Sequence, residues 1–239
     1  MDALISSLAF AFAAGLVFLA AAAADRRIAV AFALVGAVYL GLDDLVTGLP
    51  QTFRVLGVPG ARWNWSGKIL SLLFSALVMV ALRLSPAAVG LTRPHRFGRM
   101  GVLALAFAVV WGASLGLLFK PGQATLETLA FQATMPGLSE ELVYRGICPA
   151  LLLGVVQRRE PGPGLSWAVI LATAVAFGLW HGLGYSRGHL GFDAMSAVVP
   201  FVGSIAIGWL RFRTGSLLVP TLVHGIANVA FHVAGGLVA

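Results

Sequence analysis

The chain has 239 residues, of which 59% are hydrophobic and only 10% are charged, and its formal net charge is +7. Its apolar runs are too long for the core helices of a soluble domain, which places the chain among membrane proteins. The Lys and Arg residues stand singly or in pairs between these runs, so we expect no nucleic-acid partner. Cys148 is the only cysteine, which excludes both a disulfide framework within the chain and a multi-cysteine metal site.

The apolar runs predict an all-α, polytopic bundle of about eight transmembrane helices. A helix needs about 20 mostly apolar residues to cross a bilayer, because every backbone N–H and C=O group must be paired within the segment. The predicted spans cover residues 3–24, 28–49, 69–84, 100–119, 138–156, 165–183, 194–210 and 217–237. Asp43 and Asp44 interrupt the second span, and we interpret them as marking a helix end at the membrane surface.

The segment between the fourth and fifth spans predicts a short interfacial helix. Residues 123–135 place apolar side chains at helical spacing with polar residues between them. Pro136 and Gly137 then restart the chain into the fifth span. No internal repeat and no long linker divides the sequence, so we expect one integrated membrane domain.

The positive charges predict an orientation. Ten Arg residues lie at the ends of odd-numbered spans or in the loops after them. Five Lys or Arg residues, among them Lys68, fall in the loops after even-numbered spans. The positive-inside rule therefore favours odd loops in the cytoplasm and both termini outside. The Arg-rich, Lys-poor composition hints at a GC-rich bacterial genome, so we expect a multi-pass protein of a bacterial inner membrane.

Two neighbouring acids in the fifth span invite a functional interpretation. An ionisable side chain inside a bilayer costs about 2.5 to 3.5 kcal/mol, so it calls for pairing or function. Glu141 and Arg145 are one turn apart and can form an ion pair on one helix face. Glu140 points about 100° away and stays free to act on a water molecule. We expect both acids near a helix N-terminus, whose partial positive charge stabilises carboxylates.

Two further pairs are each spaced by one helical turn: Phe177 with His181, and His224 with Asn228. An imidazole beside a carboxylate can share the deprotonation of water, and an imidazole with an amide can donate hydrogen bonds to a developing oxyanion. Those are the parts of a peptide hydrolase. Taken alone, each residue is also consistent with a polar contact between helices.

The patterns E-E-x-x-x-R at 140–145, F-x-x-x-H at 177–181 and H-x-x-x-N at 224–228, in this order, resemble the CPBP family of intramembrane proteases. That family includes the type II CAAX prenyl endopeptidases and the bacterial Abi proteins. The resemblance covers about the last hundred residues. It implies a CPBP-like catalytic core at residues 123–239, built on the C-terminal four helices, and N-terminal transmembrane helices of variable type at residues 1–122.

The resemblance also implies a role for each motif residue. Glu140 and His181 would activate the water, and His224 and Asn228 would stabilise the oxyanion. Glu141 and Arg145 would hold the site together, with Phe177 as the motif partner of His181. The expected partners are the lipid bilayer and a membrane-associated polypeptide substrate. Prenylated tails, leader peptides and C-terminal anchors of surface proteins all remain open as substrates.

Alternatives to this mechanism stay open. A Glu with two His can bind zinc in a three-ligand catalytic arrangement. No His pair here forms H-E-x-x-H, and an Asn one turn after His224 suits an oxyanion hole better, so we favour a glutamic mechanism without metal or other cofactor. A zinc-dependent version of the same protease and a non-proteolytic, immunity-like or regulatory family member are the alternatives. A proton-coupled transporter is disfavoured, because the two halves show no repeat.

Overall fold

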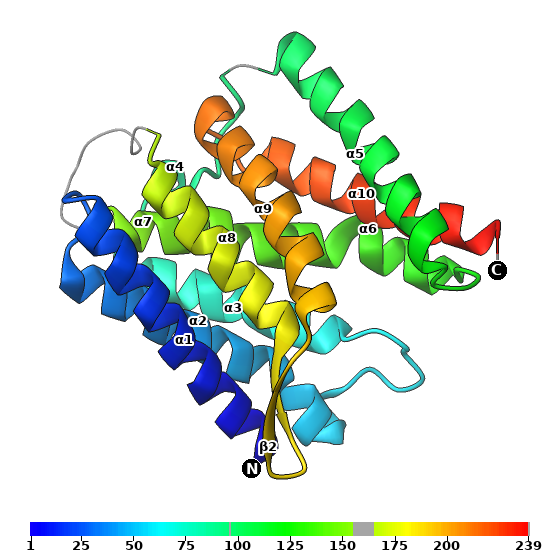
Figure 1. Ribbon diagram of the computed structural model, residues 1–239, viewed down its shortest axis with the longest axis horizontal. Coiled ribbons are helices and arrows are strands. Elements are labelled where there is room, and N and C mark those ends of the chain that lie inside the picture. Colours follow the sequence, from blue (N-terminus) through cyan, green and yellow to red (C-terminus); the bar gives the residue numbers. More distant parts are fainter. Residues whose placement is uncertain (96, 155–164, 239) are drawn as a thin grey trace.

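The computed structural model describes residues 1–95, 97–154 and 165–238, and it shows a bundle of helices with one small hairpin (Figure 1). The elements are α1 Asp2–Ala24, α2 Val30–Thr52, η1 Arg54–Leu56, α3 Trp65–Ala81, α4 Pro86–Val89, α5 Gly98–Phe119, α6 Leu126–Glu141, the π-helix η2 Leu142–Ile147, α7 Cys148–Leu152, α8 Trp167–Gly182, β1 Leu183–Ser186, β2 His189–Phe192, α9 Ala194–Thr214 and α10 Leu218–Gly236.

The helices confirm an all-α, polytopic membrane protein. Within the described residues, α1, α2, α5, α9 and α10 are long and apolar enough to cross a membrane, and α3 and α8 are shorter apolar helices. Each of the eight predicted spans overlaps one of these seven helices or the run from α6 to α7. The spans were therefore found from hydropathy, although several of their ends differ from those predicted.

The expected break at Pro136 was wrong. The chain is helical without interruption from Leu126 to Leu152, with Pro136 inside α6. A proline removes one backbone hydrogen bond, and membrane helices tolerate this where side-chain hydroxyls and neighbouring helices pair the freed groups. The carbonyl of Gln132 loses its donor at Pro136; the neighbouring hydroxyls of Thr134 and Ser139 donate to the carbonyl oxygens of Ala130 and Met135 instead, at 2.7 and 2.9 Å. The packing of α3 and α10 on α6 holds the helix through this position.

The two acids therefore do not lie at a helix N-terminus, as we expected. Glu140 follows the start of α6 by 14 residues, which is about 21 Å along the helix axis. The field of a helix end acts mainly within the first and last turns. It cannot stabilise carboxylates at this depth, so their charges must be compensated by side chains.

The interpretation of Asp43 and Asp44 was also wrong, because both lie inside α2. Ser71 of α3 donates to Asp43 at 2.7 Å. Asp44 accepts from Ser7 of α1 at 2.6 Å and from the indole Nε1 of Trp180 of α8 at 2.7 Å. Hydroxyl and indole donors from three neighbouring helices thus allow α2 to continue through two acids.

The helices pack in two groups about the run from α6 to α7, which crosses the middle of Figure 1. On one side α1 packs on α2 and α8, and α3 packs on α2 and α6. On the other side α10 packs on α5 and α6, while α9 packs on α8. At Gly112 and Gly116 of α5, an added Cβ would collide with backbone carbonyl oxygens of α10, so small residues allow this close approach.

A β-hairpin joins α8 to α9 directly after His181. Its strands are antiparallel, with Ser186 paired to His189. The two turn residues, Arg187 and Gly188, have φ of 52° and 84°. A two-residue turn with positive φ at both positions matches the right-handed twist of the strands. The hairpin therefore extends the chain beyond the end of α8 before α9 begins.

Candidate active site

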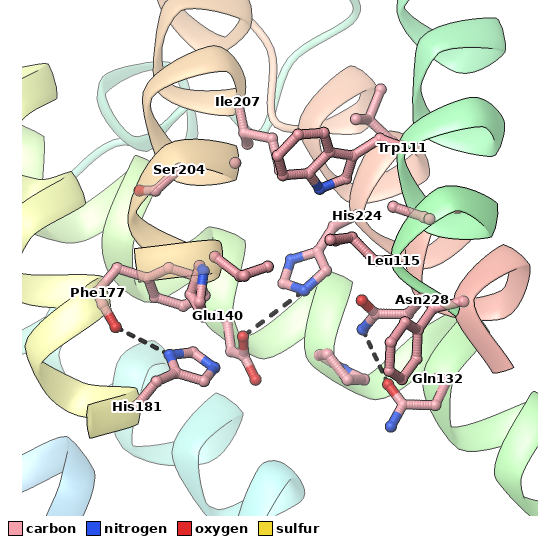
Figure 2. A pocket seen from close by; sticks show the side chains of 18 of the residues that line it. Trp111, Leu115, Gln132, Glu140, Phe177, His181, Ser204, Ile207, His224 and Asn228 are labelled. Carbon is pink, nitrogen blue, oxygen red and sulfur yellow. Dashed lines mark hydrogen bonds and ion pairs between the residues drawn. The ribbon is translucent and has the colours of Figure 1, made fainter. Parts of the chain in front are cut away.

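A cavity of about 1010 Å³ lies between the two groups of helices, and α3, α5, α6, α8, α9 and α10 all line it. The four predicted catalytic residues reach it from three of these helices: Glu140 from α6, His181 from α8, His224 and Asn228 from α10 (Figure 2). Aromatic and aliphatic side chains of α5 and α9 form much of the remaining wall. The three motifs, far apart in the sequence, thus share one cavity.

Glu140 is held by a lysine that the sequence analysis did not identify. Nζ of Lys68, from α3, lies 2.6 Å from Oε1 of Glu140, and each side chain is only 9% exposed. The ammonium also lies 4.7 Å from the ring centroid of Trp180. We had counted Lys68 as a loop charge because it stands near the start of an apolar run. An ionisable side chain inside a bilayer needs a partner, and applying this rule to Lys68 would have predicted an acidic partner for it.

The second carboxylate oxygen of Glu140 faces His224. Oε2 of Glu140 lies 3.8 Å from Nε2 of His224, and Nδ1 of His224 lies 2.7 Å from Oε1 of Glu141. Because a carboxylate only accepts, Nδ1 carries the hydrogen of the second contact. Glu141 thereby fixes the tautomer and the orientation of His224, with Nε2 toward Glu140.

Glu141 and Arg145 form the ion pair that their spacing predicts. Nη1 of Arg145 lies 3.3 Å from Oε1 of Glu141, and both side chains are almost completely buried. The guanidinium also lies 4.4 Å from the ring centroid of Phe177. Arg145 belongs to the π-helical turn, and Gly146 beside it brings that turn close to the backbone of Val89. Glu141 therefore compensates Arg145 and orients His224 at the same time.

His181 is positioned by its own helix and by aromatic rings. Its Nδ1 lies 2.9 Å from the carbonyl oxygen of Phe177, which can only accept, so Nδ1 is the donor. The ring packs edge-on against Phe177 and Trp180, with centroid distances of 4.5 and 4.7 Å. In the neutral imidazole, Nε2 then has a free lone pair at the cavity. Phe177 thus contacts both the Arg145 guanidinium and the His181 imidazole.

Asn228 is paired with a second residue that we did not predict. Its Nδ2 donates to Oε1 of Gln132 at 2.8 Å, as Figure 2 shows. Gln132, Pro136 and Glu140 follow at intervals of four along α6 and all line the cavity. Residues spaced by four lie on one face of a helix, so the sequence could have indicated that Gln132 shares the face of Glu140. One amide hydrogen of Asn228 and its carbonyl oxygen have no partner among the described residues.

The charges around Glu140 and Glu141 compensate one another in pairs, while Asp193 adds a separate carboxylate where the hairpin meets the cavity. Lys68 is paired with Glu140, and Arg145 with Glu141. With both histidines neutral, these four side chains carry no net charge. Any negative charge that develops in the cavity must therefore be stabilised by hydrogen-bond donors or by a proton taken up nearby.

Residues 121–230 match the family model described as type II CAAX prenyl endopeptidase Rce1-like. This segment is an Rce1-like domain. It contains all three motifs, and the family is one of the CPBP proteases that the motifs resembled. A protease family, an all-α fold and several apolar helices together identify a multi-pass membrane protein with an Rce1-like peptidase domain. No curated protein and no solved structure matches the chain. Lys68 lies outside the Rce1-like segment.

Proposed function

We propose that the protein is an intramembrane endopeptidase that hydrolyses a peptide bond in a membrane-associated protein or peptide. The observation that carries this proposal is the convergence of Glu140, His181, His224 and Asn228 on one cavity. A peptidase of this kind needs a base for water and donors for an oxyanion, and the four side chains offer both.

In the proposed reaction, a water molecule sits between Oε2 of Glu140 and Nε2 of His181. Its oxygen attacks the carbonyl carbon of the scissile bond, and the proton it loses goes to Glu140, with His181 accepting a hydrogen bond from the same water. Lys68 holds Oε1 of Glu140, so only Oε2 is directed at the water. When the C–N bond breaks, the proton passes to the leaving nitrogen, giving a new carboxyl group and a new amine.

His224 and Asn228 stabilise the oxyanion of the tetrahedral intermediate. Nδ1 of His224 already donates to Glu141, so Nε2 can donate only if the imidazole carries both protons. The carboxylates of Glu140 and Glu141 lie on either side of this imidazole, 3.8 and 2.7 Å from its two nitrogens. Asn228 supplies the amide hydrogen that Gln132 does not occupy.

A zinc-dependent version of the reaction fits these residues poorly. The ammonium of Lys68 stands 2.6 Å from Oε1 of Glu140, so a second cation at that oxygen would meet strong repulsion. Within the described residues, no three His, Cys, Asp or Glu side chains are grouped as metal ligands. We therefore retain the glutamic mechanism. The complete set of reactive side chains also favours a protease over a non-proteolytic member of the family.

We further propose that the protein lies in the bacterial inner membrane with both termini outside. Lys68 belongs to α3, and on the odd side Arg99 belongs to α5 while Arg211 and Arg213 belong to α9. Leaving out these helical residues on both sides keeps the excess of positive charge on the odd side, which supports the same orientation. Thiol labelling in a Cys148→Ser background tests it. A cysteine at the exposed Gln123 should react with a membrane-impermeant reagent in intact cells, and one at the exposed Ala87 should not. The opposite pattern would reverse the orientation.

Comparing new N-termini in membranes tests the proposed activity. The same host membranes, carrying either the wild type or Glu140→Gln, are labelled for free α-amines and analysed by mass spectrometry. We expect a set of new N-termini in membrane-associated polypeptides that depends on Glu140. Glu127→Gln is the matched control, because Glu127 lies on the same helix and only accepts hydrogen bonds from Arg62 and two tryptophans. Identical sets for wild type and Glu140→Gln would refute the proposal.

A further inference from the structure

The hairpin after His181 is joined to the catalytic cavity at both ends. His181 precedes β1 by two residues and lines the cavity, and Asp193, which follows β2, lines it as well. The backbone N–H of Asp193 donates to the carbonyl oxygen of Gly182 at 2.8 Å, which closes the base of the hairpin. A polypeptide bound along the hairpin would therefore reach His181 in the cavity.

The register determines which backbone groups of the hairpin point outward. The pairs Gly182–Asp193, Gly184–Gly191 and Ser186–His189 alternate with the pairs Leu183–Phe192 and Tyr185–Leu190. In an antiparallel ladder, hydrogen-bonded and non-hydrogen-bonded pairs alternate. Since the Gly182–Asp193 pair is hydrogen-bonded, the N–H and C=O groups of Leu190 and Phe192 point away from β1.

The two edges of the hairpin differ. The edge of β1 is covered by α1, since the N–H of Tyr185 donates to Oγ of Ser6 at 2.8 Å. The edge of β2 is open: all its residues are exposed, and among the described residues the backbones of Leu190 and Phe192 make no hydrogen bond. Natural proteins protect an exposed edge by keeping the strand very short or with Lys, Pro or a bulge. β2 has four residues, and of the side-chain and bulge devices it has none. It instead carries Leu190 and Phe192, which are 59% and 57% exposed.

A polypeptide substrate needs hydrogen-bond partners of the kind that this open edge offers. Its scissile bond must be in an extended segment to be reached, and the backbone groups of that segment need partners wherever water is scarce. An open strand edge supplies such partners to an extended peptide. The glycine pair Gly184–Gly191 leaves open space on one face of the hairpin, where a Cβ added at Gly184 would meet nothing within 4 Å.

We propose that an extended segment of the substrate binds to the outer edge of β2 as a third strand, with its backbone paired to Leu190 and Phe192. This places the neighbouring peptide bond at His181 and Glu140. Apolar side chains of the segment lie on the face of Leu190 and Phe192 at every second position, and small or polar ones lie on the face of Gly191. The proposal rests on the protease function proposed above.

The first test removes one outward N–H. Leu190→Pro takes away a donor that the hairpin itself does not use, and proline is tolerated at strand edges in this position. The probe is the membrane polypeptide whose new N-terminus depends most strongly on Glu140. We expect kcat/KM for this polypeptide to fall by about tenfold or more, the loss typical of an unmade backbone hydrogen bond. Leu190→Ala keeps the backbone N–H, so its kcat/KM for the same polypeptide should fall clearly less. Equal losses for both variants would overturn the proposal.

The second test does not depend on how well the proline variant folds. A cysteine replaces Leu190 in a Cys148→Ser, Glu140→Gln protein, and single cysteines are moved along the probe beside its cleavage site. Strand pairing predicts disulfides with a period of two along the probe. A cysteine at Arg187, in the turn, is the control and should show no such period. A uniform pattern, or none, would overturn the edge site.

The two proposals fail in different ways. If Leu190→Pro cleaves the probe normally and no periodic disulfides form, while Glu140→Gln is inactive, only the edge site is wrong. If Glu140→Gln produces the same new N-termini as the wild type, the protease function is wrong and the edge site falls with it.

Discussion

Replacing Lys68 by Met tests whether the buried ion pair supports the site. Methionine keeps the length and the apolar stem of the side chain but removes the ammonium 2.6 Å from Glu140. The carboxylate is then left among apolar walls with no opposite charge of comparable proximity. Removing one partner of a buried pair typically costs about 3 to 5 kcal/mol. Since each side chain is only 9% exposed, solvent screens little of this loss.

The loss is measurable as a change in thermal stability. For a chain of this size, 1 kcal/mol corresponds to about 2 to 4 °C, so the unfolding midpoint in detergent should fall by about 6 to 20 °C. If Glu140 instead takes up a proton, the stability loss is smaller but the base is lost. Lys68→Met should therefore reduce turnover even where much stability is retained.

A double-mutant cycle separates the pair from the two single side chains. Glu140→Gln alone leaves Lys68 unpaired, so Lys68→Met combined with Glu140→Gln should be more stable than the sum of the single changes predicts. The matched control is Lys120→Met, because Lys120 is the only other lysine and is exposed after α5. If Lys68→Met matches this control in midpoint and turnover, and the cycle shows no coupling, the ion pair has no role in the site.

The remaining predictions concern the proposed chemistry. Glu140→Gln or His181→Ala should lower turnover by at least about 10²-fold, and near-normal turnover would contradict a general base there. His181→Ala should retain the unfolding midpoint, whereas Glu140→Gln should lower it because Lys68 is left buried and unpaired. Arg145→Ala should lower the unfolding midpoint by an amount corresponding to about 3 to 5 kcal/mol, because it leaves Glu141 buried and unpaired; an unchanged midpoint with no activity would instead place Arg145 in the substrate site. Dialysis against a strong chelator should leave activity intact, whereas loss of activity that stoichiometric zinc restores would establish a metal mechanism.

The four candidate side chains came from the spacing of their motifs together with the family resemblance, and the structure brings all four to one cavity. Spacing by one turn puts His224 and Asn228 on one side of α10, and no knowledge of helix packing is needed for that. The spacing of Glu141 and Arg145 likewise predicted the ion pair that the structure contains. Hydropathy located the helices, since a membrane span must pair its own backbone.

Contacts between helices could not be read in the same way. Lys68 and Glu140 are 72 residues apart, and nothing local to either one indicates the other. Asp43 and Asp44 looked like a helix end because their partners, such as Ser71, come from other helices. Pro136 looked like a break because its tolerance depends on the side chains and helices around α6. In each case the expectation came from neighbouring residues in the sequence, and side chains from another helix determined the outcome.

Trp180 shows how helices outside the Rce1-like segment contribute to the candidate active site. Its indole N–H donates to Asp44 of α2 at 2.7 Å, its ring lies under the Lys68 ammonium of α3, and its edge contacts His181. The base of the proposed reaction is thus held from α3, and the imidazole beside it is supported through α2. A fragment that began at residue 123 would leave Glu140 without its ammonium and Trp180 without its acceptor. The N-terminal helices therefore supply the ammonium that pairs with Glu140 and the acceptor that holds Trp180 at the cavity.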